Sequence, residues 1–120
     1  DNNGVDSEVS HRQAEHFIKK NNFQCALKCI EQARMGYLKQ NEGERDFGEK
    51  FVAIVSTQAI CLLKLGDFIT AKKFAEEVLV RTTSAEAQFV KAESLYNLCE
   101  FEHALVTFYK GQKLCFALRT

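Results

Sequence analysis

The segment LKLGDFITAKKFAEEVL, residues 63–79, has the apolar spacing of two helices joined by a two-residue turn. The segment YNLCEFEHALVTFYKGQ, residues 96–112, repeats this pattern 33 positions later, which aligns Gly66 with Cys99. A third copy lies 45 positions upstream of the first segment, with Asn21 at the turn. The sequence pattern of one helical hairpin therefore occurs three times in this chain.

The three copies share small residues at fixed places in both helices. These residues are Ala14, Ala59 and Ala92 in the leading helices, and Ala26, Ala71 and Ala104 in the trailing helices. Small side chains let two antiparallel helices approach closely. The unit is about 34 residues long, with about eleven residues inserted after the first copy, and this period is typical of stacked helix pairs. A hairpin cannot cover its own apolar face, so we expect an all-α stack of three antiparallel hairpins.

The apolar spacing predicts six helices, at about residues 7–20, 22–40, 47–65, 67–82, 84–98 and 100–115. The expected organisation is a flexible segment 1–6, a domain 7–115 with repeats at about 7–40, 47–82 and 84–115, and a segment 116–120 that starts a capping helix or forms a tail. Asp67 suits a helix N-cap, and Thr83 with Glu86 has the form of a capping box. Residues 40–50 contain two glycines and many charges, which indicates the tip of a long hairpin.

Composition places the chain among globular domains. It has 120 residues, of which 46% are hydrophobic and 27% charged, with a formal net charge of zero. The sixteen basic and sixteen acidic residues are interspersed, so we expect no nucleic-acid or membrane partner. No apolar run approaches the ~20 residues of a membrane span, and no signal-peptide core is visible. We therefore expect a soluble, cytoplasmic protein.

Five cysteines occur, at Cys25, Cys29, Cys61, Cys99 and Cys115. Their number is odd and none forms a CxxC pair, so reduced thiols and no metal site are expected. A redox or metal protein is the remote alternative.

Nothing in the sequence indicates an enzyme. The triplet Asp46-Phe47-Gly48 matches a kinase metal-binding motif but lacks every other kinase motif. His11, His16 and His103 have no nucleophile in a recognisable spacing. We therefore expect no catalytic residue and no cofactor.

The three copies resemble the tetratricopeptide repeat over about residues 7–115. In that family an aromatic residue follows the turn, and here Phe23, Phe68 and Phe101 hold that place. The resemblance implies a right-handed superhelix of three hairpins that binds other proteins. Two features depart from the family. Asn21 and Cys99 replace the usual turn glycine, and no proline follows the trailing helices, which puts the turn geometry in doubt.

Two narrower resemblances remain open. VKAESLYNLCEFEHALVTFYKGQKL, residues 90–114, and QAICLLKLGDF, residues 58–68, are similar to the tetratricopeptide subunits of outer dynein arm docking complexes. That resemblance implies an adaptor in the ciliary axoneme. The long link between the first two copies is similar instead to immunophilin-type co-chaperones. That resemblance implies a co-chaperone-like module.

Such co-chaperones hold the Glu-Glu-Val-Asp tail of heat-shock chaperones with a clamp of Lys, Arg and Asn side chains. The matching positions here are His11, Glu15, Thr57, Glu86 and Val90. None keeps the family's residue, and two are acidic, so they would repel the carboxylates of the tail. We therefore expect no clamp for that peptide.

The leading helices of stacked hairpins line the concave side, where a ligand is expected. The predicted groove consists of Arg12, Glu15, Lys19, Thr57, Ile60, Phe89, Val90, Glu93 and Asn97. Phe89 and Val90 either pack on the previous hairpin or form an exposed anchor between Glu86 and Glu93. An exposed anchor would suit a peptide or helix with a hydrophobic residue beside Lys or Arg.

The chain end is apolar. KLCFALRT, residues 113–120, places Leu114, Phe116 and Leu118 where a repeat array usually has a polar cap. Either a capping helix is missing, as in a truncated chain, or the three residues form a patch for another chain, including a second copy.

Overall fold

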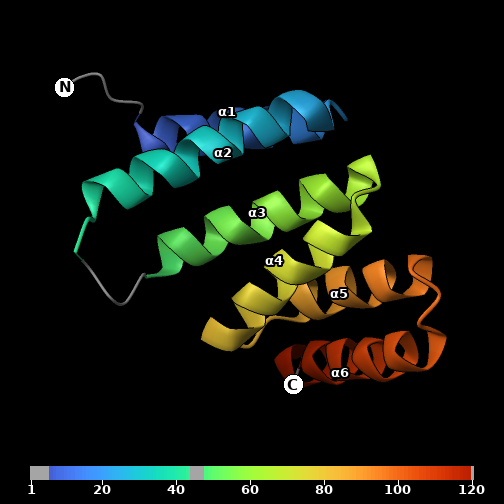
Figure 1. The fold of residues 1–120 in the computed structure, drawn as a ribbon. Coiled ribbons are helices and arrows are strands. Elements are labelled where there is room, and N and C mark those ends of the chain that lie inside the picture. The colour runs from blue at the N-terminus through green and yellow to red at the C-terminus, as the bar shows by residue number, and fades with distance from the viewer. Residues whose placement is uncertain (1–5, 44–47, 120) are drawn as a thin grey trace.

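The computed structural model describes residues 6–43 and 48–119, with the backbone alone at 118 and 119. These residues form six α-helices and no strand, which confirms the expected all-α class (Figure 1). The helices are α1 (Ser7–Lys19), α2 (Phe23–Gln40), α3 (Glu49–Leu65), α4 (Phe68–Arg81), α5 (Ala85–Asn97) and α6 (Phe101–Arg119). Most of the expected flexible segment, and residues 44–47 of the expected hairpin tip, lie outside the described residues.

The helices form three hairpins, α1 with α2, α3 with α4 and α5 with α6. Each hairpin packs on the next through its trailing helix, because α2 contacts α3 and α4 contacts α5. The leading helices also contact in series, α1 with α3 and α3 with α5. Figure 1 shows the hairpins side by side, with α1 and α6 at opposite ends of the stack. None of the described helices is long and apolar enough to cross a bilayer.

The small residues that recur in the repeats are buried in the core. Ala14, Ala26 and Ala71 have no exposed surface, and Ala59 is 2% exposed. Larger side chains such as Ile54 fill the space between them and are also buried. The repeated alanines therefore have the packing role that their spacing indicates.

All three hairpins have the same turn. The turn residues Asn21, Gly66 and Cys99 have positive φ angles of 61°, 88° and 67°. In each case the next amide donates a hydrogen bond to the carbonyl five residues earlier. These bonds are Asn22 to Phe17 at 2.8 Å, Asp67 to Leu62 at 2.9 Å and Glu100 to Leu95 at 2.9 Å. The loss of glycine at two turns therefore leaves the turn geometry unchanged.

The left-handed conformation at Cys99 carries a cost that glycine avoids. A residue with a Cβ in this region destabilises the folded state by about 1–2 kcal/mol. Glycine has a larger entropy in the unfolded chain, and this offsets part of the difference between the two residues. Replacing Cys99 by glycine is expected to raise the free energy of unfolding by about 0.5–1 kcal/mol, measured by urea denaturation. Asn21→Gly is the control and should gain less, since asparagine tolerates this conformation. A loss of stability in Cys99→Gly would contradict the expectation.

Helix ends agree with the expected positions in most places. Asp67 is confirmed as an N-cap, because its carboxylate accepts from the Thr70 amide at 3.2 Å. The capping box at Thr83 is wrong by one residue. Ser84 is the N-cap of α5, and its hydroxyl accepts from the Ala87 amide at 3.1 Å. Serine is among the strongest N-caps, and its extended backbone sets the start of the helix.

The last helix is longer than expected. It runs to Arg119, so residues 116–119 extend α6 instead of starting a separate element. Residues 112–119 contain no glycine or proline, and the leucine, alanine, lysine and arginine among them favour helix.

A partly buried arginine joins the first two hairpins. The Arg34 guanidinium on α2 donates to the Gln58 side-chain carbonyl at 3.0 Å. It also lies 3.5 Å from the Glu77 carboxylate. The rings of Phe51 and Phe74 each lie 5.2 Å from its central carbon. Arg34 therefore contacts both α3 and α4 from α2.

Candidate protein-interaction site

Two residues of the predicted groove are buried between hairpins. Thr57 is 9% exposed, and its hydroxyl lies 3.3 Å from His11 Nε2 on α1. Val90 is 6% exposed and packs in the core with Leu62 and Leu63 of the second hairpin. Arg12 holds the equivalent repeat position on α1 and is exposed. The position thus faces the preceding hairpin, so Thr57 and Val90 offer no surface to a partner.

The other members of the predicted groove have accessible side chains. Ile60 and Phe89 are half-buried, and the exposed members are Glu15, Lys19, Glu93 and Asn97. The repeat offsets from Phe89 and Asn97 lead to Ser56 and Lys64 on α3, which sequence reasoning missed. An alignment of the three leading helices, position by position, contains the signal that identifies these residues.

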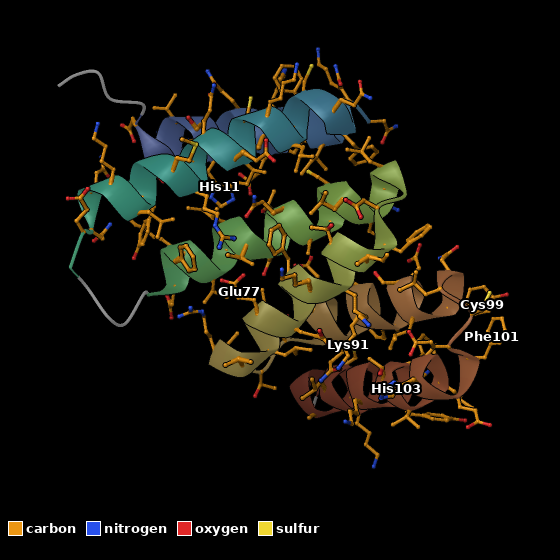
Figure 2. The ribbon with its side chains drawn as sticks, in the orientation of Figure 1. His11, Glu77, Lys91, Cys99, Phe101 and His103 are labelled. Carbon is orange, nitrogen blue, oxygen red and sulfur yellow. The ribbon has the colours of Figure 1, made fainter. Side chains whose placement is uncertain are left out.

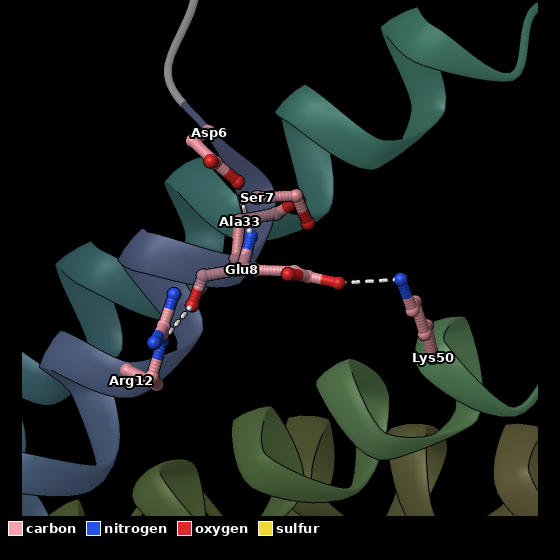
Figure 3. A network of polar contacts seen from close by, with 6 residues as sticks. All are labelled: Asp6, Ser7, Glu8, Arg12, Ala33 and Lys50. Carbon is pink, nitrogen blue, oxygen red and sulfur yellow. Dashed lines mark hydrogen bonds and ion pairs between the residues drawn. The ribbon is translucent and has the colours of Figure 1, made fainter.

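An ion pair beside this surface joins α1 to α3. Figure 3 shows the Glu8 carboxylate of α1 bonded to the Lys50 ammonium of α3. The hydrogen bond and the charge of Lys50 lower the pKa of Glu8, and Glu8 in turn raises the pKa of Lys50. Nearby, the Ser7 hydroxyl donates to the Ala33 carbonyl of α2 at 3.0 Å. These contacts fasten α1 to its neighbours.

A pocket of about 550 Å³ lies between α5 and α6, at the open face of the third hairpin. Its lining residues are Phe89, Ala92, Glu93, Tyr96, Phe101, Ala104, Leu105 and Phe108. The rings of Phe89 and Phe108 are 5.5 Å apart, and those of Tyr96 and Phe101 meet edge-on at 5.3 Å. The structure therefore brings the predicted Phe89 and Glu93 together with four exposed large side chains that the predicted groove omits.

Several apolar side chains at this pocket are more than half exposed. Tyr96 is 62% exposed, and Phe101 and Leu105 are each 55% exposed. In the second hairpin the residue equivalent to Tyr96 is Leu63, which is 7% exposed and packs with Val90 of α5. The second hairpin has an equivalent surface, and α5 covers it. The pocket thus lies on the corresponding surface of the third hairpin.

Gly111 shapes the wall of the pocket. A Cβ placed on Gly111 would lie 2.6 Å from a ring atom of Phe89, which is closer than carbon atoms approach without contact strain. The equivalent residues in the other hairpins, Val78 and Ala33, do carry a Cβ. The glycine therefore lets the Phe89 ring lie against α6 beside Phe108.

Another hollow, of about 760 Å³, lies at the start of α6 and is lined by Cys99, Glu100, Phe101, Glu102, His103 and Val106. Figure 2 shows Cys99 and Phe101 at the outer edge of the third hairpin. No hydrogen bond joins Cys99 to His103 in the part of the chain that the structure describes.

Two thiols of the first two hairpins, Cys29 and Cys61, are poor nucleophiles. Burial raises the pKa of Cys61 to about 11. Burial, with a smaller effect of Cys25, also raises the pKa of Cys29. Metal binding and redox chemistry both need the thiolate, so these environments oppose either use.

No protein-family model matches this sequence, and no curated protein is significantly similar to it.

Proposed function

We propose that this chain is a non-enzymatic protein-interaction module, an adaptor whose pocket between α5 and α6 binds a segment of another protein. The observation that carries the proposal is the cluster of exposed Tyr96, Phe101, Leu105 and Phe108 around one pocket. Exposed apolar clusters of this kind are typical of protein-binding surfaces. Aromatic side chains also supply most of the energy in many interfaces.

The charge at the rim suggests the chemistry of the partner. Among the residues that the structure describes, Glu93 is the one charged residue that lines the pocket, and its carboxylate has no ion pair with any of the others. A Lys or Arg next to an apolar residue would pair with this carboxylate. We therefore propose a helical or extended segment that combines apolar and basic residues.

The tetratricopeptide superhelix is the architecture that we propose for the three hairpins. Three identical turns and the serial contacts of α1, α3 and α5 support it. A place in ciliary dynein docking is part of this proposal, and it depends on the resemblance of residues 58–68 and 90–114. The second candidate is a co-chaperone-like module without a carboxylate clamp, supported by the long link after α2.

Affinity purification of the intact protein with its partners separates these two candidates. Axonemal proteins would favour the docking role, and chaperones would favour the co-chaperone role. Direct binding still has to be shown with purified components, because co-purification does not identify the surface.

A charge reversal at the rim tests the pocket directly. The probe is a labelled amphipathic helical peptide with leucines on one face and lysines beside them, and anisotropy reports its binding. Glu93→Lys is expected to weaken binding about tenfold, since an attractive pair becomes repulsive. It should also reduce the salt dependence of the affinity.

Glu86→Lys is the matched control, because Glu86 is an exposed glutamate on the same helix outside the pocket lining. It should change the affinity much less than Glu93→Lys. Equal effects of both variants, or no binding of the lysine-flanked peptide by the unchanged protein, would contradict the proposed function.

A further inference from the structure

Exposed apolar residues form a stripe along one face of α6. Phe101, Leu105, Phe108 and Phe116 recur at helical spacing, and Gln112 is the one polar position among them. Phe108 is 43% exposed and Phe116 is 69% exposed, and Phe101 and Leu105 lie between these values. The stripe extends beyond the pocket towards the C-terminal end of the helix.

The charges beside the stripe have opposite signs at its two ends. Glu102 lies in the first turn of α6, and Lys113 lies 11 residues later on the same side of the helix. Both side chains are exposed, and neither has an ion-pair partner in residues 6–43 and 48–117. An antiparallel copy of this helix would place each charge opposite its counterpart.

We propose that a second copy of this chain packs antiparallel on α6, with a two-fold axis near Phe108. In this arrangement Phe101 of each copy lies against Phe116 of the other, and Glu102 pairs with Lys113. The interface is self-complementary, as a two-fold axis requires. The antiparallel arrangement also brings the positive end of each helix dipole near the negative end of the other.

The available surface is sufficient for a reversible dimer. Tyr96 and Tyr109, 62% and 55% exposed, flank the four apolar residues of the stripe. Together these six side chains expose about 600 Å² of mostly apolar surface. A stable interface typically buries about 800 Å² per partner, so we expect a dissociation constant in the micromolar range.

This inference goes beyond the proposed function and does not depend on it. The second copy would cover Phe101, Leu105 and Phe108, which also line the pocket. Dimer formation and partner binding would therefore compete. The residues that distinguish the two are Glu93, which belongs to the pocket, and Lys113, which belongs to the stripe.

Sedimentation equilibrium from about 1 to about 200 µM tests the dimer, with a mass twice that of one chain expected at the upper end. Leu105→Glu is expected to leave a monomer over this range, because it places two unpaired carboxylates in an apolar interface. Val80→Glu is the matched control, since Val80 is 87% exposed on α4 and should not affect dimerisation. Circular dichroism should show unchanged helix content in both. A monomeric unchanged protein, or a Leu105→Glu variant that still dimerises, would overturn the proposal.

Charge swaps test the antiparallel arrangement. Glu102→Lys and Lys113→Glu should each weaken dimerisation about tenfold, since either creates two like-charge pairs. The double variant should recover the original affinity, and failure to recover it would overturn the pairing. Glu93→Lys should leave dimerisation unchanged while it weakens peptide binding, so failure of one proposal is distinguishable from failure of the other.

Discussion

Replacing Phe51 by alanine is expected to lower the free energy of unfolding by about 3–5 kcal/mol, the largest stability effect of any single substitution proposed for this chain. Phe51 is 1% exposed and packs with Val55, Val78 and Ala87, so one ring contacts α3, α4 and α5. It also lies 5.6 Å from the ring of Tyr37 on α2. Four helices therefore border the cavity that the substitution creates.

The size of this effect depends on how far the neighbours can close the cavity. Arginine side chains lie over the Phe51 ring, with Arg34 at 5.2 Å and Arg81 at 5.3 Å, and alanine would remove both contacts. Phe51→Leu retains most of the volume and should cost less than half as much. Urea denaturation of both variants measures the difference. A loss below about 1 kcal/mol for Phe51→Ala would show that this ring does not hold the hairpins together.

Replacing Arg34 by alanine is expected to cost about 2–3 kcal/mol, the next largest effect. The substitution removes the donor to Gln58, a side chain that is only 3% exposed. A buried carbonyl oxygen that loses its donor is costly because its burial has removed it from bulk water. The guanidinium contacts with Phe51 and Phe74 are lost as well.

Two further variants identify which contact of Arg34 matters. Arg34→Lys keeps the charge but lacks the planar fork, so we expect about half of the loss. Glu77→Gln removes only the ion pair with Arg34, whose side chains are 25% and 28% exposed, and should cost below about 1 kcal/mol. If Glu77→Gln cost as much as Arg34→Ala, the ion pair rather than the buried hydrogen bond would be the main contribution.

Local features of the hairpins could be predicted from the sequence with few errors. The repeat offsets located all three turns, because the residue at each turn and the aromatic two positions later obey short-range rules. The error at Thr83 arose because Thr83 and Ser84 are adjacent and both suit an N-cap. Only the backbone of the loop after α4 selects Ser84.

The candidate site was predicted only in part. The predicted groove includes Phe89 and Glu93 but not Leu105 and Phe108, because it consists of residues of the leading helices alone. Thr57 and Val90 were placed on the groove although both are buried. Periodicity shows which residues share a face of a helix, and it does not show which face the preceding hairpin covers.

The sequence by itself determined the six helices, the three equivalent turns and the small residues shared by the repeats, because each depends on residues within one repeat. Tertiary structure alone decided which equivalent positions are buried. Leu63 and Tyr96 hold the same place in their hairpins, yet Leu63 is covered by α5 and Tyr96 is 62% exposed. The physical reason is that burial depends on the neighbouring hairpin, whose contacts join residues far apart in the chain.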